Sequence, residues 1–342
     1  MTDQSPVFIV GMARSGTTLM RAFLSAHPGI AVSPETHFLS YWVRRHGHEE
    51  LRGWSDYRDF WAAFSASHHF TRMGVDPADV SARLPADEPP TFRNVFTALM
   101  DAYAATTGKP RWGEKTPGHH AHLARVLGWY PNAQVVYMLR DPRAVVASLL
   151  EAPWAEPSIT HQAARWRDST RSLNAWEGDP RVQIVHYEAL VTDPETTLRR
   201  VCEFLGEPFD ERMMARGGAS RQESSGYGQW GQSHIREAHA PLRTDSLLKW
   251  QQRLTAQQVA LIEYLTRKGM FRYGYTAVTE GPGAFGWARL MGARVHDRLF
   301  REVRRVQGTA RADVADVPPG AQTQVRGEVN AETPARPEES GK

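Results

Sequence analysis

A short loop near the N-terminus constrains the fold more than any other part of this sequence. The apolar residues 7–10 end at Gly11, four residues separate Gly11 from Gly16, and two threonines follow. Residues 19–24 are mostly apolar and predict a helix. Glycines let the backbone turn so that several N–H groups point at one anion, and the helix N-terminus adds its positive end. This segment therefore predicts a phosphate-binding loop between a buried strand and a helix.

The position of the cation in this loop narrows the kind of phosphate it can hold. P-loop kinases and ATPases place a lysine directly after the second glycine, where this chain has Thr17. The cation stands instead inside the loop, at Arg14. This arrangement suits a grip on one phosphate group better than the steering of a β/γ-phosphate pair with bound magnesium. The alternative for the loop alone is a glycine turn before a structural helix.

Two later apolar runs extend the fold prediction. Residues 134–139 and 182–185 predict strands, and helical patterns separate all three strands from one another. This alternation favours right-handed crossovers. We therefore predict an α/β fold of the P-loop nucleotide-binding class, with a central, mainly parallel sheet flanked by helices. Residues 42–103 combine scattered aromatic side chains with helical spacing, and we expect them to form helical insertions over the active site.

The C-terminal part of the chain differs in composition. We expect residues 1–278 to form the catalytic domain and residues 279–307 to form a basic amphipathic helix. From 308 to 342 there is no aromatic residue, Leu, Ile or Met, so we predict a disordered tail that buries too little apolar area to offset its ordering entropy. The apolar stripe of the basic helix favours packing on the protein's own core. Contact of residues 285–306 with an anionic membrane surface or a partner is the alternative.

Composition excludes several classes of function. The 342 residues include 41 Lys+Arg and 38 Asp+Glu, a formal net charge of +3 that is too small to indicate a nucleic-acid partner. The single cysteine, Cys202, excludes an internal disulfide and a multi-thiolate metal site. No run approaches the roughly 18 apolar residues of a membrane span. The first residues carry no basic segment, so we expect no signal peptide and a cytoplasmic location.

A second candidate anion site follows the predicted strand at 134–139. Arg140 stands at its carboxyl end, and Ser148 lies about two helical turns further on, in a helix opened by Pro142. Asp141 suits a role in ordering the turn. The alternative is that Arg140 pairs with Asp141 or caps the sheet.

The two sites together resemble those of sulfotransferases that use 3′-phosphoadenosine 5′-phosphosulfate (PAPS). The Arg-Ser-Gly-Thr-Thr form of the loop resembles the protein-tyrosine sulfotransferases and their bacterial relatives. The resemblance implies in-line transfer of a sulfuryl group from PAPS to an acceptor hydroxyl or amine, with release of adenosine 3′,5′-bisphosphate. It also implies that Arg140 and Ser148 bind the 3′-phosphate. The residues implied at the 5′-phosphate and sulfuryl group are Arg14, Ser15, Gly16, Thr17 and Thr18.

A further aromatic residue enters through the same resemblance. Tyr187 follows the strand predicted at 182–185, where the family has a tyrosine near the nucleotide. We therefore take Tyr187 as a nucleotide-binding candidate. A plain aromatic residue at a strand end is the equally weighted alternative.

Sulfuryl transfer needs a base near the acceptor and a cation near the oxygen that bridges to the departing phosphate. Glu35 resembles the base of the tyrosine and heparan enzymes, and His37 two residues on is a weaker candidate for an acceptor contact. Lys115 lies in a Glu-Lys-Thr-Pro segment that resembles the heparan 3-O-sulfotransferases, where the lysine lies beside the transferring group. Glu114 would pair with this lysine or serve as a rival base.

Several alternatives remain open at this stage. A P-loop small-molecule kinase would need Lys at position 17 and a magnesium-binding Asp, and a non-catalytic nucleotide-binding module would be favoured if Glu35 or Lys115 pointed away from the loop. The histidines at 119, 120 and 122 do not all share one helical face, so we expect no metal site. The acceptor is undetermined between peptide tyrosine, a carbohydrate, a lipid and a small phenol.

Overall fold

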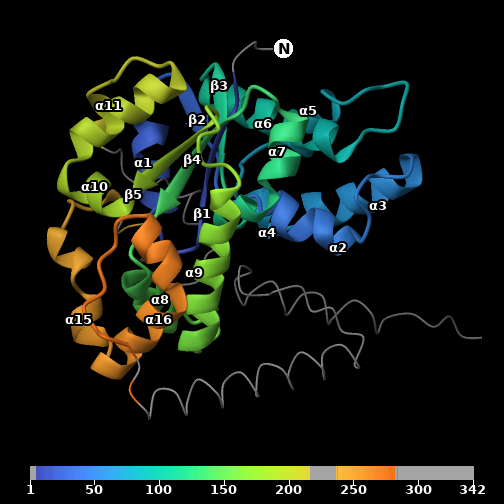
Figure 1. Ribbon diagram of the computed structural model, residues 1–342. Helices are drawn as coiled ribbons and strands as arrows, with labels where there is room; N and C mark the ends of the chain where they lie inside the picture. The colour runs from blue at the N-terminus through green and yellow to red at the C-terminus, as the bar shows by residue number, and fades with distance from the viewer. Residues whose placement is uncertain (1–4, 216–235, 237, 282, 284–342) are drawn as a thin grey trace, which may run out of the picture.

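A five-stranded parallel sheet forms the centre of the molecule, with the strand order β2-β3-β1-β4-β5 (Figure 1). The computed structural model describes residues 5–215, 236, 238–281 and 283. The strands are β1 (Val7–Gly11), β2 (Ile30–Val32), β3 (Arg111–Lys115), β4 (Gln134–Leu139) and β5 (Val182–His186). The predicted α/β fold with a parallel sheet is confirmed. Strands β2 and β3 were not predicted.

Helices connect every pair of consecutive strands. In the described residues they are α1 (Thr17–Ala26), η1 (Phe38–Val43), α2 (Arg44–His46), α3 (Trp54–Ser65), α4 (His68–Thr71), α5 (Pro77–Ser81), α6 (Phe92–Thr107), η2 (Pro117–His122), α7 (Leu123–Trp129), α8 (Pro142–Leu150), α9 (Ile159–Asn174), α10 (Tyr187–Thr192), α11 (Pro194–Leu205), α12 (Arg212–Ala215), η3 (Thr244–Leu247), α15 (Trp250–Arg253) and α16 (Ala256–Arg272). Of these, η1 is a π-helical turn and η2 and η3 are 3-10 helices.

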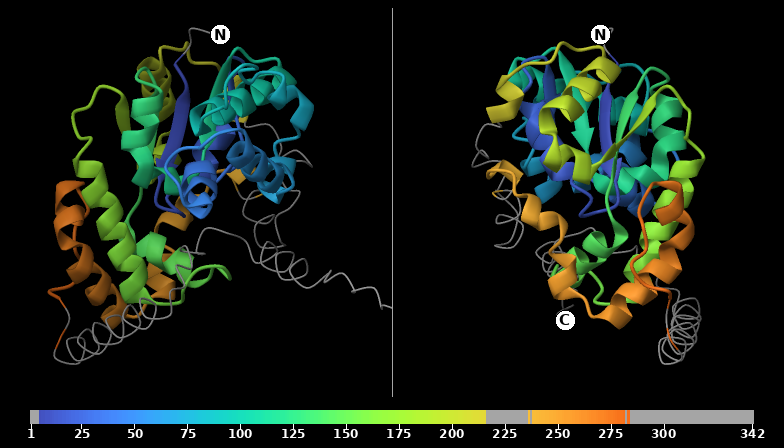
Figure 2. Two further views of the ribbon diagram at one scale, coloured as in Figure 1. Left: turned by 90° about the vertical axis from the view of Figure 1, so that its right-hand side faces the viewer. Right: turned by 60° about the vertical axis from the view of Figure 1, so that its left-hand side comes forward.

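The two faces of the sheet carry separate hydrophobic cores. Successive side chains of β1 point to opposite faces, so Val7 and Ile9 pack with α1 and α11, while Phe8 and Val10 pack on the other side. On that second side lie α6, α7 and α9. Both faces are thus covered by helices, as a parallel sheet requires. Helix α16 packs side by side with α9 (Figure 2).

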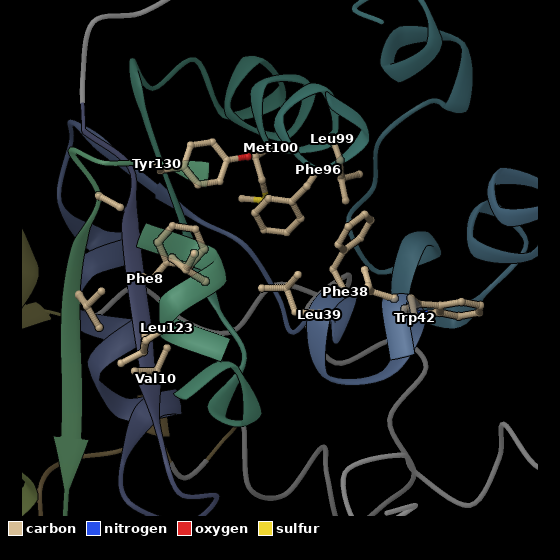
Figure 3. Close-up of a cluster of buried hydrophobic side chains, with 14 of the residues drawn as sticks. Phe8, Val10, Phe38, Leu39, Trp42, Phe96, Leu99, Met100, Leu123 and Tyr130 are labelled. Carbon is tan, nitrogen blue, oxygen red and sulfur yellow. The ribbon is translucent and has the colours of Figure 1, made fainter. Parts of the chain in front are cut away.

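The residues between β2 and β3 form a helical lobe beside the sheet (Figure 1). Its core is aromatic: Phe38 of η1 lies 5.0 Å from Phe96 of α6, and Phe96 in turn lies 6.2 Å from Phe8 of β1 (ring centroids; Figure 3). Trp42 and Leu39 extend this core from η1. Because η1 follows Glu35 by only three residues, the aromatic core anchors the segment that carries the predicted base.

The predicted boundaries at the C-terminal side fall largely outside the described residues. Of the predicted basic helix at 279–307, only 279–281 and 283 are described, and the predicted tail at 308–342 lies entirely outside them. Among the helices in the described part of the chain, none combines the length and the apolar character that crossing a membrane requires.

Candidate active site

The predicted site residues meet at the carboxyl edge of the sheet, because parallel strands all end there. Ile9 of β1 is level with Lys115 of β3, and Gly11 is level with Met138 of β4. Beyond β2, the N–H of Ser33 donates to the carbonyl of Gly113 at 2.8 Å. The loop after β1, the Glu35 segment after β2 and the end of β3 are therefore brought side by side.

The loop after β1 depends on close backbone approaches that only glycine permits. Gly11 has φ +144°, and a Cβ there would lie 2.3 Å from the carbonyl oxygen of Met138. Gly16 has φ +95°, and a Cβ there would lie 2.4 Å from the Tyr187 ring. Between them, Arg14 adopts φ +73°. The loop then enters α1 at Thr17, as the sequence predicts.

Arg14 joins the loop to the second predicted anion site. Its Nε donates to Ser148 Oγ at 2.8 Å, although 134 positions separate the two residues. Arg140 Nη1 donates to the Arg14 carbonyl at 3.1 Å. The structure therefore brings the two predicted anion sites together as neighbours, with Arg14 reaching from one to the other.

Arg140 and Tyr187 form the other wall of this site. The Arg140 guanidinium carbon lies 4.1 Å from the centroid of the Tyr187 ring, within cation–π distance. The Trp166 indole N–H donates to the Arg140 carbonyl at 2.9 Å and fixes the strand end. Asp141 caps α8 by accepting from the Arg143 N–H at 2.8 Å, and it forms an ion pair with the Arg143 guanidinium. Asp141 thus orders the turn, as expected.

Glu35 and Lys115 form a nearly buried ion pair beside the loop. Lys115 Nζ contacts Glu35 Oε1, and it lies 3.4 Å from Thr18 Oγ1 of the loop. Glu35 Oε2 lies 3.1 Å from His37 Nε2. The exposed fraction is 19% for the Glu35 side chain and 4% for that of Lys115. Lys115 therefore reaches the loop, and Glu35 is connected to the loop through Lys115.

The electrostatics of the pair keep Glu35 ionised. Burial raises the pKa of Glu35, but the charge of Lys115 and the hydrogen bond from His37 outweigh burial and hold this pKa well below its ordinary value of 4.5. Burial and the charge of Arg21 lower the pKa of Lys115, and Glu35 opposes them. Arg21 Nε also donates to the Ser33 carbonyl at 2.8 Å, so a buried arginine of α1 fixes the start of the Glu35 segment.

Glu114 does not have either of the roles expected from the sequence, which were pairing with Lys115 and serving as a rival base. Its Oε1 accepts from the Thr36 hydroxyl at 2.9 Å and from the Thr116 hydroxyl, and its Oε2 accepts from His119 Nδ1 at 2.9 Å. His119 Nε2 in turn accepts from the Leu39 N–H at 3.2 Å. Glu114 is fully buried, and its oxygens are occupied by these donors. It therefore clamps the Glu35 segment onto β3 and is neither the partner of Lys115 nor a free base.

Sequence reasoning identified His37 but missed the second histidine behind Glu35, His69. His69 lies on α4, and its ring centroid is 4.9 Å from that of His37. Within the described ranges, no group of three or more His, Cys, Asp and Glu side chains is arranged to hold a metal ion. No sequence signal links His69 to His37, because the contact depends on how the helical lobe folds against η1.

Fold and site together define a nucleotide-binding protein of the P-loop type, with a carboxylate and an ammonium beside the loop. A model of the sulfotransferase family matches residues 6–211. A putative protein-tyrosine sulfotransferase of Caenorhabditis briggsae is 27% identical over 217 residues, covering 61% of this chain and 68% of that protein. Protein-tyrosine sulfotransferase 1 of Danio rerio is 26% identical over 221 residues, covering 62% and 56%.

The solved structures agree on the fold. The sulfotransferase domain of the Synechococcus PCC 7002 olefin synthase superposes with a TM-score of 0.58 at 24% identity, covering 81% of this chain and 97% of that one. The chain belongs to the sulfotransferase family. The expected sulfotransferase family is thereby confirmed, and the P-loop kinase alternative is not favoured. The chain spans between about half and about two thirds of the length of the curated relatives named here.

Proposed function

We propose that this protein transfers the sulfuryl group of PAPS to an acceptor hydroxyl, with Glu35 as the general base and Lys115 as the cation at the bridging oxygen. The observation that carries the proposal is the buried Lys115–Glu35 pair, set 3.4 Å from Thr18 of the phosphate-binding loop. A base and a cation beside an anion loop are the groups that this reaction needs.

The two phosphate-binding regions divide the nucleotide between them in this proposal. The loop from Arg14 to Thr18 takes the 5′-phosphate and sulfuryl group, while Arg140 and Ser148 take the 3′-phosphate. The contact between Arg14 and Ser148 supports this division, since it shows that the two regions adjoin. Tyr187 stacks on Arg140 and packs on Gly16, a position that suits contact with the nucleotide between them.

The chemical step is balanced by these groups. The acceptor oxygen forms a bond to sulfur as its proton passes to Glu35, and the bond from sulfur to the 5′-phosphate oxygen breaks. The electron pair of that bond leaves on the phosphate oxygen, where Lys115 and Arg14 stabilise the developing charge. Adenosine 3′,5′-bisphosphate and the sulfated acceptor are the products.

The ion pair also gives the base a resting state. While Lys115 holds Oε1, the lowered pKa makes Glu35 a weak base. We propose that the phosphosulfate competes for the Lys115 ammonium and draws it toward Thr18. Burial, which raises the pKa of Glu35, then acts with less opposition, and Oε1 is left open for the acceptor proton.

We also propose that turnover needs no divalent metal, because the protein's own groups supply the positive charge that the reaction needs. Arg14, Lys115 and the loop N–H groups supply positive potential where the bridging oxygen gains charge. Initial rates at saturating PAPS should therefore be unchanged by excess EDTA. A rate that collapses on chelation and returns with magnesium would count against this mechanism.

Cytoplasmic location and the role of residues 285–306 also remain proposals. The single cysteine, Cys202, is buried and free, which suits a reducing compartment.

The favoured interpretation of the basic segment 285–306 is packing on the protein's own core, and contact with an anionic membrane is the alternative. Binding of the full chain to vesicles containing phosphatidylserine would support the membrane alternative.

Transfer of ³⁵S from labelled PAPS tests the function directly. The acceptors are a tyrosine-containing peptide, an oligosaccharide, a hydroxylated lipid and a small phenol, with the peptide first because similar proteins bear the name protein-tyrosine sulfotransferase. We expect label on one acceptor class with the wild type and none above background with Glu35→Gln. Transfer from γ-labelled ATP with no transfer from PAPS would contradict the proposal.

A further inference from the structure

Two histidine rings stand in line behind Glu35, one of them from a distant helix. His37 Nε2 lies 3.1 Å from Glu35 Oε2. The ring centroid of His69, on α4, lies 4.9 Å from that of His37. On its far side, His69 Nδ1 accepts a hydrogen bond from the Trp42 indole N–H at 3.2 Å. His37 and His69 are 3% and 1% exposed, so solvent does not complete their hydrogen bonding.

The hydrogen-bond partners fix the proton positions on both rings. The Trp42 indole nitrogen is a donor only, so His69 Nδ1 must be unprotonated and, in the neutral ring, the proton sits on Nε2. Burial, with a further contribution from the positive charge of Arg72, lowers the pKa of His69 well below 6.5, which keeps this ring neutral at pH 7. The Glu35 carboxylate is an acceptor only. His37 Nε2 therefore carries a proton, and in the neutral ring Nδ1 is left as an acceptor.

Both remaining ring nitrogens are buried and lack a hydrogen-bond partner among the described residues. They are His69 Nε2, which is a donor, and His37 Nδ1, which is an acceptor. A buried polar atom without a partner costs free energy and calls for an explanation. Here the two atoms are complementary and sit on adjacent rings. A hydrogen bond from His69 Nε2 to His37 Nδ1 would align every donor toward the base, from Trp42 through His69 and His37 to Glu35.

We propose that His69 is a positioning residue that fixes the tautomer of His37, so that His37 always presents an N–H to Glu35. This inference rests on the proposed function, because a fixed tautomer of His37 affects the reaction only if Glu35 is the base. The His37 N–H then anchors Oε2, and Oε1 stays directed toward Lys115 and the acceptor. Without His69, His37 is free to move its proton to Nδ1 and to face the carboxylate with a lone pair.

The protons on the two rings provide a test that needs no acceptor. We suggest labelling the histidines of the full chain with ¹⁵N and recording long-range ¹H–¹⁵N spectra at pH 7.5, with the signals assigned from His37→Gln and His69→Gln. We expect both rings to be neutral with the proton on Nε2. In His69→Phe the fixed tautomer of His37 should be lost. A proton on His37 Nδ1 in the wild type, or an unchanged His37 signal in His69→Phe, would overturn the proposal.

A double-mutant cycle on kcat tests whether His37 and His69 act on Glu35. It uses the acceptor identified by transfer of ³⁵S from labelled PAPS. Loss of a hydrogen bond to a charged group in the transition state lowers the rate roughly tenfold to a hundredfold. We expect His37→Met and His69→Phe each to lower kcat by about tenfold, with little change in KM for PAPS. His37→Gln and His69→Gln, which keep a donor, should recover part of kcat.

The double variant separates positioning from a general loss of stability. If His69 acts only through His37, adding His69→Phe to His37→Met should cost less than about twofold more in kcat. Multiplicative losses would show that His69 acts by another route and overturn the proposal. If His69→Phe does not fold, the wild-type spectrum alone decides between the tautomers. If the wild type transfers no sulfuryl group, the proposed function fails, while the spectra still report whether His69 fixes His37.

Discussion

At the scale of single residues, we propose that the Lys115–Glu35 pair stays in an unreactive form until a ligand separates it. Lys115 contacts the Glu35 Oε1 that the proposed reaction needs, and it lies within reach of Thr18 on the loop. This pairing lowers the pKa of Glu35, so in the resting state Glu35 is charged but weakly basic. In this proposal, nucleotide binding and activation of the base are coupled through the movement of the Lys115 side chain.

Replacing the base should abolish turnover without abolishing binding. Glu35→Gln keeps the shape and removes the proton acceptor, so we expect kcat to fall by about 10²–10⁴. Affinity for adenosine 3′,5′-bisphosphate, measured by calorimetry, should stay within a few fold, because Lys115 keeps its place beside Thr18. Glu151→Gln, which changes an exposed glutamate paired with Arg253, is the matched control and should leave kcat unchanged. Wild-type turnover in Glu35→Gln would remove Glu35 from the mechanism.

Much of the site could be predicted residue by residue, because sequence motifs record the groups that touch ligands. Arg14, Glu35, Lys115 and Arg140 do gather at one edge of the sheet. The role of Glu114 could not be predicted, since one of its donors, Thr36, is 78 positions away, and the turn after β3 decides whether Thr116 and His119 reach the carboxylate. His69 was missed for the same reason.

At the scale of elements, the junction between the loop and α10 depends on the absence of a side chain at Gly16. A Cβ there would lie 2.4 Å from the Tyr187 ring, and the backbone has φ +95°. Gly16→Ala should therefore displace Tyr187, and we expect a loss of stability of about 1–3 kcal/mol together with weaker nucleotide binding. Chemical denaturation and calorimetry measure the two effects.

The control for this prediction is Gly47→Ala. Gly47 has φ +83° but nothing within 4 Å of the position of a Cβ, so this variant carries backbone strain without a clash. We expect it to lose some stability and to bind the nucleotide normally. If Gly16→Ala binds as well as Gly47→Ala does, then Tyr187 does not contribute to the nucleotide site.

Strands β2 and β3 show why part of the fold could not be predicted. β2 has only three residues, and β3 reads Arg-Trp-Gly-Glu-Lys although all five positions are buried. Its charged side chains are stabilised by partners far along the chain: Arg111 pairs with Glu207, and Lys115 with Glu35. An apolar pattern therefore never appears in the sequence, and tertiary contacts define the strand.

At the scale of the whole molecule, two half-buried histidines, His68 and His122, should make the fold sensitive to acid. Burial, followed by nearby positive charges, lowers the pKa of His68 to about 4 and that of His122 to about 3. The unfolded chain then takes up these protons first, so stability is complete above about pH 6.5 and declines as the pH falls below it.

Thermal unfolding between pH 8 and pH 4.5 measures this decline. We expect the midpoint temperature of the wild type to decrease once the pH is below about 6.5. The midpoint temperature of His122→Gln should decrease less over the same pH interval. His161 is half-exposed, and the midpoint temperature of the control variant His161→Gln should change with pH as that of the wild type does. Parallel curves for the wild type and His122→Gln would show that His122 does not contribute to the acid sensitivity.

We propose that two adjoining anion sites receive both phosphates of a PAPS-type nucleotide. Calorimetry with adenosine 3′,5′-bisphosphate and with AMP tests it most directly, because the two ligands differ only in the 3′-phosphate. A charge-assisted phosphate contact is worth about 1.5–3 kcal/mol, so the bisphosphate should bind roughly ten- to a hundredfold more tightly. Arg140→Ala should remove most of that difference. Equal affinity of the wild type for the two nucleotides would contradict the assignment of the second site.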